Sequence, residues 1–117
     1  MAEPLHLTSL NRFELVNAIN LSFFRNTISR TVCTRAIEKL DANIAGGGLV
    51  IVSCDWAAVH ARALQIAIQH TGTTGCRGMD VLHVATALEL GAAEFLTFDA
   101  RQAALAKAAG LKLPLGL

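Results

Sequence analysis

The sequence predicts an α/β fold in which a parallel sheet is packed between layers of helices. Three observations carry this prediction. Helix-like and strand-like segments alternate along the chain, which is typical of parallel sheets with helices on both faces. The run LVIVS at residues 49–53 is β-branched and suits a strand that is buried on both faces. Hydrophobic residues make up 53% of the chain and charged residues 16%, so a buried core is expected rather than disorder.

The first half of the chain predicts two helices ahead of this strand. Residues 9–21 place apolar side chains at helical spacing, and Thr8 or Ser9 can cap the helix N-terminus. Residues 27–44 form a second helical segment, and the three consecutive glycines at 46–48 end it. The chain is therefore expected to turn from the second helix directly into the strand.

The second half of the chain predicts three more helices and two more strands. Residues 55–71 read as a helix with apolar side chains facing inward, and residues 73–78 as a loop. A further helix opens at Asp80, and a short strand at residues 94–99 leads into a helix that runs to Ala109. The final segment, LKLPLGL, predicts a strand that Pro114 confines to a sheet edge. Only three strands are thus expected.

The size and apolar pattern of the chain limit its class and location. A length of 117 residues predicts a single domain spanning residues 1–117. The apolar runs are far shorter than the roughly 20 residues that a membrane helix needs, so no membrane segment is expected. The first residues lack the basic and apolar regions of a signal peptide, so we expect a cytoplasmic protein.

Cysteine, histidine and charge patterns argue against several kinds of site. The three cysteines form no CxxC pair and predict reduced, buried thiols, and the four histidines lack zinc-site spacing. A net charge of +1 gives no general attraction to nucleic acid. One local basic stretch is either a phosphate-contacting surface or a solvated helix face. Its members are Arg25, Arg30, Arg35 and Lys39.

Three acidic residues are candidates for a functional site. Asp80 opens a helix, and Asp99 closes a strand directly before another helix. If that strand is parallel to its neighbours, Asp99 lies at its carboxyl end, where open α/β sheets place their ligand crevice. Each aspartate can instead be a helix cap. Glu14 shares a helix face with apolar residues, and either completes a capping box with Asn11, points to solvent, or needs a partner.

A cluster of carboxylates from separate elements repels itself unless a cation occupies its centre. Mg²⁺ suits such a cluster because it prefers hard oxygen ligands and keeps waters that a phosphate oxygen can displace. In phosphodiester hydrolysis the ion can lower the pKa of a bound water and stabilise charge on the leaving oxygen. Glu14, Asp80 and Asp99 are therefore the candidate ligands.

Neighbouring residues extend this candidate site. Thr97, two residues before Asp99, either holds a ligand water or a phosphate or is an ordinary strand residue. Arg77 either contacts phosphate or flanks a turn. His83 lies three residues after Asp80 on one helix face, as a general base or as a structural histidine.

At these residues a family resemblance becomes usable. The segment RGMDVLHVATALELGAAEFLTFDARQAALAKAAGL, residues 77–111, closely resembles the C-terminal half of PIN-domain ribonucleases, particularly the VapC-like toxins of bacterial toxin–antitoxin pairs. The match consists of an aspartate opening a helix, a histidine three residues on, a Gly-Ala turn, a strand ending Thr-Phe-Asp and a closing Gly-Leu. Residues 8–19, TSLNRFELVNAI, resemble the family helix that carries the second acidic residue, here Glu14.

The resemblance implies a PIN-like three-layer α/β/α fold and a Mg²⁺-dependent or Mn²⁺-dependent endoribonuclease. It implies that Glu14, Asp80 and Asp99 are catalytic and metal-binding residues, with Thr97 supporting them. The implied partners are an RNA substrate, a cognate antitoxin protein that inhibits the toxin, and a second copy of the chain in a homodimer.

One departure from the family pattern matters. PIN domains begin with a central strand whose end carries a first catalytic aspartate, whereas this chain begins just ahead of the Glu14 helix. We therefore expect that strand to be missing, and Glu3 does not replace it because MAEPLHL shows no comparable strand. The chain is then a shortened form of a functional nuclease or a decayed domain.

Two rival functions remain open. The first is a catalytically inactive PIN remnant that binds an antitoxin segment or RNA without cutting either. The second is a CheY-like regulator, in which aspartates at strand ends bind Mg²⁺ for phosphoryl transfer. This second rival needs a phosphorylatable aspartate on an early central strand, and none is visible.

Overall fold

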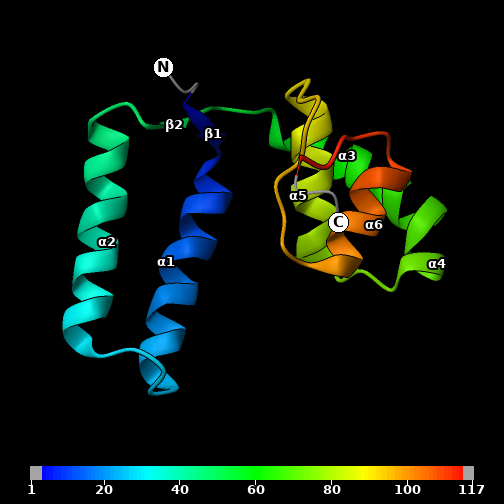
Figure 1. Ribbon diagram of the computed structural model, residues 1–117. Helices are drawn as coiled ribbons and strands as arrows, with labels where there is room; N and C mark the ends of the chain where they lie inside the picture. Colours follow the sequence, from blue (N-terminus) through cyan, green and yellow to red (C-terminus); the bar gives the residue numbers. More distant parts are fainter. Residues whose placement is uncertain (1–3, 115–117) are drawn as a thin grey trace. The chain divides into compact units, whose positions relative to one another are not determined.

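A computed structural model of the chain describes residues 4–114 (Figure 1). By its internal contacts the chain divides into two compact units, with the boundary between Ser53 and Cys54. Each unit is described by itself below. The prediction of a single domain over residues 1–117 is not tested by this division.

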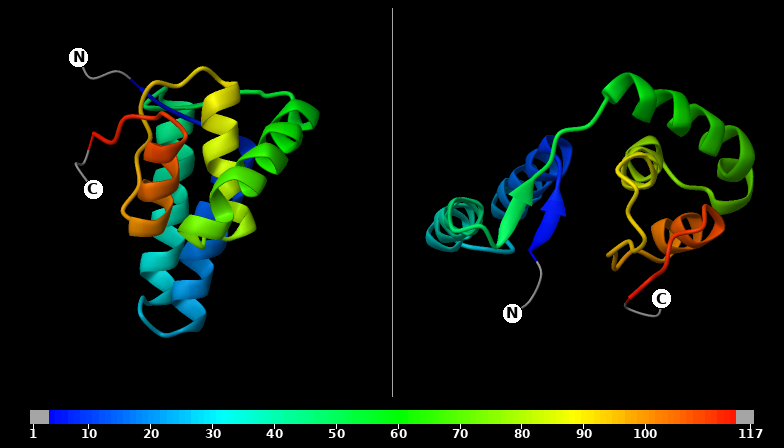
Figure 2. Two further views of the ribbon diagram at one scale, coloured as in Figure 1. Left: turned by 90° about the vertical axis from the view of Figure 1, so that its right-hand side faces the viewer. Right: turned by 90° about the horizontal axis from the view of Figure 1, so that it is seen from above.

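The first unit contains two strands and two helices. In chain order they are β1 (Leu5–Leu7), α1 (Ser9–Phe24), α2 (Arg30–Ala45) and β2 (Leu49–Ile51). The two strands pair in parallel, with Leu5 opposite Leu49 and Leu7 opposite Ile51, and Figure 2 shows their arrows pointing the same way. The helices α1 and α2 pack side by side as a hairpin. The prediction of a parallel sheet is thus confirmed, with a first strand that the sequence did not predict.

The strand β1 corrects the expectation that no strand precedes the Glu14 helix. The backbone N–H of Leu5 donates to the carbonyl of Gly48 at 3.2 Å, and that of Val52 donates to the carbonyl of Leu7 at 2.8 Å. Three residues are too few to show an alternating pattern, so this strand is specified by its distant partner and not by local sequence. Thr8, and not an aspartate, follows β1.

Local capping explains where the two helices of the first unit begin. Thr8 caps α1 in a capping box with Asn11, whose Oδ1 accepts from the Thr8 backbone N–H at 2.8 Å. Because Thr8 is the N-cap residue and Asn11 is the third helical residue, the alternative of a capping box that Glu14 completes with Asn11 is wrong. The second helix begins at Arg30 and not at residue 27, because the Ser29 hydroxyl caps it.

The strand β2 is shorter and more exposed than the sequence predicts. It ends at Ile51, whose exposure is 38%, while Leu49 and Val50 are half-buried. In the described part of the chain β2 pairs only with β1, so it is an edge strand. The prediction of a strand buried on both faces is therefore wrong.

The second unit is helical and holds the main apolar core. Its elements are α3 (Trp56–Ile66), the π-helical turn η1 (Ala67–Thr71), α4 (Gly72–Thr74), α5 (Gly78–Glu89) and α6 (Ala100–Ala108). The helix predicted over residues 55–71 is confirmed as far as Ile66 and ends in the π-helical turn. Glycine at 75, with φ of +68°, then adopts the left-handed conformation that lets the chain leave α4.

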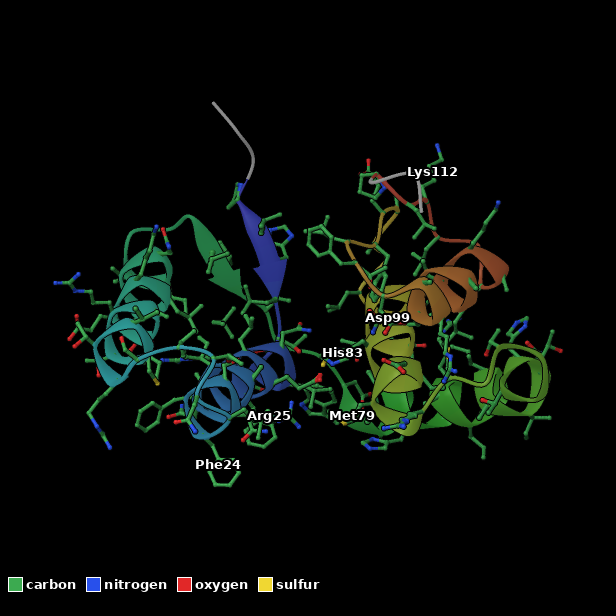
Figure 3. All side chains as sticks on the ribbon, turned by 60° about the horizontal axis from the view of Figure 1, so that its bottom comes forward. Phe24, Arg25, Met79, His83, Asp99 and Lys112 are labelled. Atoms are coloured by element: carbon green, nitrogen blue, oxygen red, sulfur yellow. The ribbon has the colours of Figure 1, made fainter. Side chains whose placement is uncertain are left out.

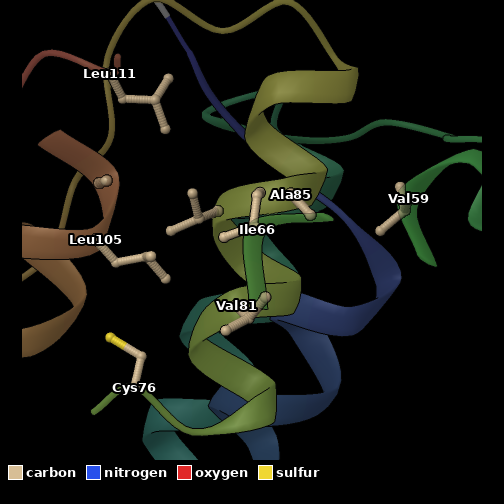
Figure 4. Packing of buried hydrophobic residues seen from close by; sticks show 9 residues of the cluster. Val59, Ile66, Cys76, Val81, Ala85, Leu105 and Leu111 are labelled. Carbon is tan, nitrogen blue, oxygen red and sulfur yellow. The ribbon is translucent and has the colours of Figure 1, made fainter. Parts of the chain in front are cut away.

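The core of the second unit forms where α3, α5 and α6 meet. Val59, Val84 and Leu105 are completely buried there, one from each helix. Figure 4 shows Leu105 of α6 and Ile66 of α3 around the face of α5 that carries Val81. This packing fixes the N-terminal ends of α5 and α6, which carry the two candidate aspartates.

The strand predicted at residues 94–99 is not formed. Only Glu94 makes an isolated parallel bridge, to Lys112, and this same bridge is all that forms of the predicted edge strand in LKLPLGL within the described residues. Phe98 is 86% exposed, so no strand or helix within residues 4–114 covers it. Residues 115–117 of that predicted strand lie outside the described residues.

The three cysteines are free thiols. Cys33 and Cys76 are buried, as predicted, whereas Cys54 is half-buried. Burial of the Cys54 thiol and the neighbouring Asp55 carboxylate together raise the pKa of that thiol.

The described helices include none with the length and apolarity required to span a membrane.

Candidate functional site

The Asp80 and Asp99 side chains line one hollow in the second unit. Asp80 lies in the first turn of α5, and Asp99 is the N-cap residue of α6. The hollow has a volume of about 560 Å³. Its lining residues are Gly75, Arg77, Asp80, Asp99, Ala100 and Arg101. Two carboxylates from different helices therefore face a common space, although no strand delivers Asp99 to it.

Both aspartates also act as helix-terminal groups, as their capping alternatives predicted. The Asp99 Oδ1 atom accepts from the backbone N–H of Gln102 at 2.9 Å. The Asp80 Oδ2 atom accepts from the backbone N–H of Arg77 at 3.3 Å. Asp80 is the third helical residue and not the first, because α5 begins at Gly78.

A side chain that sequence reasoning missed links the two aspartates. The Gln102 side-chain Nε2 donates to Asp80 Oδ1 at 3.4 Å, while the backbone N–H of the same residue binds Asp99. A glutamine three residues after an N-cap aspartate is a capping-box spacing, and this signal could have drawn attention to it. Gln102 is half-buried between the two helices' ends.

Thr97 takes part in the same network. The whole residue is only 7% exposed. Its hydroxyl accepts from the Asp99 backbone N–H at 3.0 Å and donates to Gln102 Oε1 at 2.7 Å. The hydroxyl is thus committed to protein partners around Asp99. Thr97 is not a strand residue, so the alternative of an ordinary strand residue is wrong.

The remaining predicted residues lie elsewhere. Glu14 is a half-buried residue of α1 in the first unit, so its predicted grouping with Asp80 and Asp99 stays a prediction. His83 lies on α5, as Figure 3 shows, but is not among the residues that line the hollow. Within residues 4–114, no three or more His, Cys, Asp or Glu side chains form a group that could hold a metal ion.

Two arginines give the hollow a mixed electrostatic character. Arg77 was a candidate from the sequence, whereas Arg101 was missed because it lies next to an apparently ordinary cap. Both residues are exposed. Guanidinium groups beside carboxylates suit a ligand that combines a cation with phosphate oxygens.

The basic stretch on the first unit has a partly structural explanation. The Arg30 guanidinium lies 4.7 Å from the centroid of the Phe23 ring, a cation–π contact between α2 and α1. Arg35 and Lys39 are exposed on α2. Arg30 therefore helps to hold the hairpin together.

The sequence profile of the PIN domain matches residues 1–108, nearly the whole chain. The chain belongs to the PIN domain family. PIN domains are generally nucleases and typically depend on divalent metal ions. The pair of carboxylates beside the α5 and α6 N-termini is thus found in a chain of a nuclease family. No significant match to this PIN domain was found among curated proteins.

Proposed function

We propose that this PIN domain is a metal-dependent endoribonuclease and the toxin of a VapC-like toxin–antitoxin pair. One observation carries the proposal: Asp80 and Asp99, from two different helices, line the same hollow in a chain of a nuclease family. Both are exposed or half-buried, so water and substrate can reach them. Glu14 is the third proposed carboxylate.

The donor set of the hollow fits Mg²⁺ or Mn²⁺. Both aspartates offer hard oxygen atoms, and Mg²⁺ typically takes one or two carboxylates and keeps its remaining positions for water and phosphate. Asp80 and Asp99 would hold the ion, and Thr97 would support Asp99 through its backbone. When bound, the ion supplies Lewis acidity toward the scissile phosphate and its attacking water.

The side chains around the aspartates have roles of their own in this proposal. Arg77 and Arg101 would bind phosphate oxygens on either side of the scissile bond and so orient the RNA. They are exposed, and can therefore contact a single strand without burying an unpaired charge. Without such contacts the two carboxylates would repel the RNA backbone.

The proposed partners are a cognate antitoxin protein and a second copy of the chain, in the cytoplasm. Exposed apolar side chains on the first unit support a protein partner. Phe24 is 79% exposed at the end of α1 and points away from the helix hairpin in Figure 3, and Phe13 is 64% exposed on the same helix. Apolar side chains of this kind are typical of interaction surfaces where they form a contiguous patch.

An inactive PIN domain that binds RNA or an antitoxin is the second candidate. The observation that favours it is the absence of an aspartate at the end of β1, where Thr8 begins the cap of α1. Thr8 offers a hydroxyl and no carboxylate at that position, so Asp80 and Asp99 would bind a cation with fewer acidic ligands than a nuclease needs. Such a protein would bind RNA but not cut it.

Cleavage of a varied RNA pool by the full chain, with and without Mg²⁺, tests the proposal. The wild-type protein should cut only with the metal, and Asp80→Asn should abolish cutting. Asp41→Asn is the charge-matched control, because Asp41 is exposed on α2 and forms a surface ion pair with Arg12. Metal-dependent RNA binding without cutting by the folded wild-type protein would replace the nuclease by the binding module.

A further inference from the structure

The Gln102 amide lies between the buried Thr97 hydroxyl and the Asp80 carboxylate. We propose that Gln102 is a positioning residue, whose side chain fixes the Asp80 carboxylate relative to Asp99 so that both present oxygens to one cation. The inference rests on the proposed function, since it needs a metal site at the two aspartates. It gives a role to a side chain that does not itself line the hollow.

The direction of each hydrogen bond follows from the groups involved. The Asp99 N–H donates to Thr97 Oγ1, so the Thr97 proton is available for Gln102 Oε1 at 2.7 Å. The amide oxygen is therefore held at Thr97, and Nε2 must point the other way. It meets Asp80 Oδ1, which can only accept when ionised.

The two ends of the amide are held unequally. The Thr97 contact is short, whereas the Nε2–Oδ1 distance of 3.4 Å lies at the long end of the hydrogen-bonding range. The amide is thus anchored in buried structure and presents a donor to the more exposed carboxylate. A donor that contacts a ligand side chain in this way can orient that side chain without itself binding the metal.

The neutrality of the amide is what makes it suitable. An arginine or lysine here would add to the positive charge that the exposed Arg77 and Arg101 already bring to the hollow, and would compete with a cation for the two aspartates. A glutamine orients Asp80 without adding positive charge. The carboxylates therefore keep their attraction for a divalent ion.

The backbone of residue 102 makes the side-chain effect separable. The bond from its N–H to Asp99 Oδ1 survives any substitution except proline. Gln102→Met keeps the length of the side chain but removes its donor and acceptor. The change therefore acts on Asp80 and leaves the cap of α6 intact.

The experiment measures Mn²⁺ binding to the full chain by the electron paramagnetic resonance signal of the free ion. Gln102→Met should raise the Mn²⁺ dissociation constant about tenfold. This is the lower end of the affinity loss that is typical when a hydrogen-bond partner of a metal ligand is removed. Gln65→Met is the matched control, an exposed glutamine of α3 that should bind as wild type does. In an Asp80→Asn background, Gln102→Met should cause almost no further loss.

A second variant and a second measurement exclude a purely structural role. Thr97→Val frees the Gln102 amide oxygen and also removes the acceptor of the Asp99 backbone N–H, so it should weaken Mn²⁺ binding at least as much as Gln102→Met does. Urea unfolding without metal reports the stability of each variant separately. A merely structural Gln102 would lower stability and leave the Mn²⁺ affinity of the folded protein unchanged.

The outcomes separate this inference from the proposed function. In the first outcome, the wild-type protein binds Mn²⁺ and cuts RNA, and Gln102→Met and Thr97→Val bind Mn²⁺ as tightly as wild type. Gln102 is then not a positioning residue, and the nuclease proposal stands. If the wild-type protein binds Mn²⁺, loses affinity on Gln102→Met and cuts no RNA, the positioning role stands and the nuclease fails. If the wild-type protein does not bind Mn²⁺, both are overturned.

Discussion

Asp99 and Asp55 form a natural matched pair for separating capping from metal binding. Both are N-cap aspartates in the second unit: Asp55 Oδ1 accepts from the backbone N–H groups of Ala57 and Ala58 at 3.0 and 3.2 Å, and Asp99 Oδ1 from that of Gln102 at 2.9 Å. Asparagine caps helices about as well as aspartate. Each Asp→Asn change should therefore cost only the charge interaction with the helix dipole, about 0.3–1 kcal/mol of unfolding free energy.

The metal should divide the two variants. A ligand present at 100 times its dissociation constant stabilises the folded protein by about 2.7 kcal/mol. With urea slopes of about 1–3 kcal/mol per molar, this shifts the unfolding midpoint by roughly 1–3 M. Saturating Mg²⁺ should produce this shift in the wild-type protein and in Asp55→Asn. Asp99→Asn should lose most of it, since only one of the two carboxylates in the hollow remains.

The assay is urea unfolding of the three proteins with saturating Mg²⁺ and with chelator. Without metal, the two variants should unfold within about 1 kcal/mol of wild type, which shows that both caps still function. Equal midpoint shifts for Asp99→Asn and Asp55→Asn would refute the reasoning. Asp99 would then be a cap and nothing more.

Three further predictions concern the core, the substrate surface and a thiol. Leu105→Ala should lower the unfolding free energy by about 3 kcal/mol in urea titrations because Leu105 is completely buried, whereas Leu64→Ala, at a residue 64% exposed, should change it little; similar losses would contradict the core assignment. Arg101→Gln should flatten the dependence of log RNA affinity on log salt concentration by about 0.7, the contribution of one phosphate contact on a single strand, and an unchanged slope would remove Arg101 from the RNA site. Asp55→Asn should speed alkylation of Cys54 by iodoacetamide at mildly alkaline pH. The Asp55 carboxylate helps to raise the pKa of the Cys54 thiol, so its removal increases the thiolate fraction at a given pH. The difference in alkylation rate between the variant and wild type should vanish at a pH well above the thiol pKa of either protein. An unchanged rate at mildly alkaline pH would show that Asp55 does not influence the thiol.

Local chemistry explains which parts of the fold were predictable. Helix ends followed from residues that act on close neighbours in sequence. Thr8 caps the start of α1, and Gly47, just after the end of α2, adopts a φ of +82° that favours glycine. The error at the start of α2 also has a local cause. The Ser29 hydroxyl accepts from the backbone N–H of Val32, so Ser29 is the N-cap residue and the helix starts at Arg30, not at residue 27. Predictions of this kind depend only on neighbours in sequence.

Strands were predicted less well because their partners lie far away in the chain. The three residues of β1 became a strand only by pairing with β2, more than 40 residues later. Residues 94–99 have the β-branched and aromatic composition of a strand, yet only Glu94 finds a bridge partner. Composition indicates that a segment can be a strand, and pairing decides whether it becomes one.

The candidate site was predictable in its carboxylates but not in what connects them. Asp80 and Asp99 lie at helix N-termini, and aspartate at such positions is a recognisable start signal in the sequence. Arg101 and Gln102 gain their places only because the α5 and α6 N-termini meet over the core of the second unit. The capping-box spacing from Asp99 indicates Gln102 as a cap partner, but its contact with Asp80 is tertiary and does not follow from the sequence.

Capping and metal binding are not rival explanations for the two aspartates. A carboxylate has about four lone-pair sites, and the cap of α6 uses one oxygen of Asp99. A cap, however, needs nothing beyond its own helix. The side chain of Gln102 crosses from α6 to the carboxylate of α5, held by the buried Thr97 hydroxyl. A link between two separate caps adds little to either helix end, but it ties both carboxylates to one residue, and a cation bound by the two would offset their mutual repulsion.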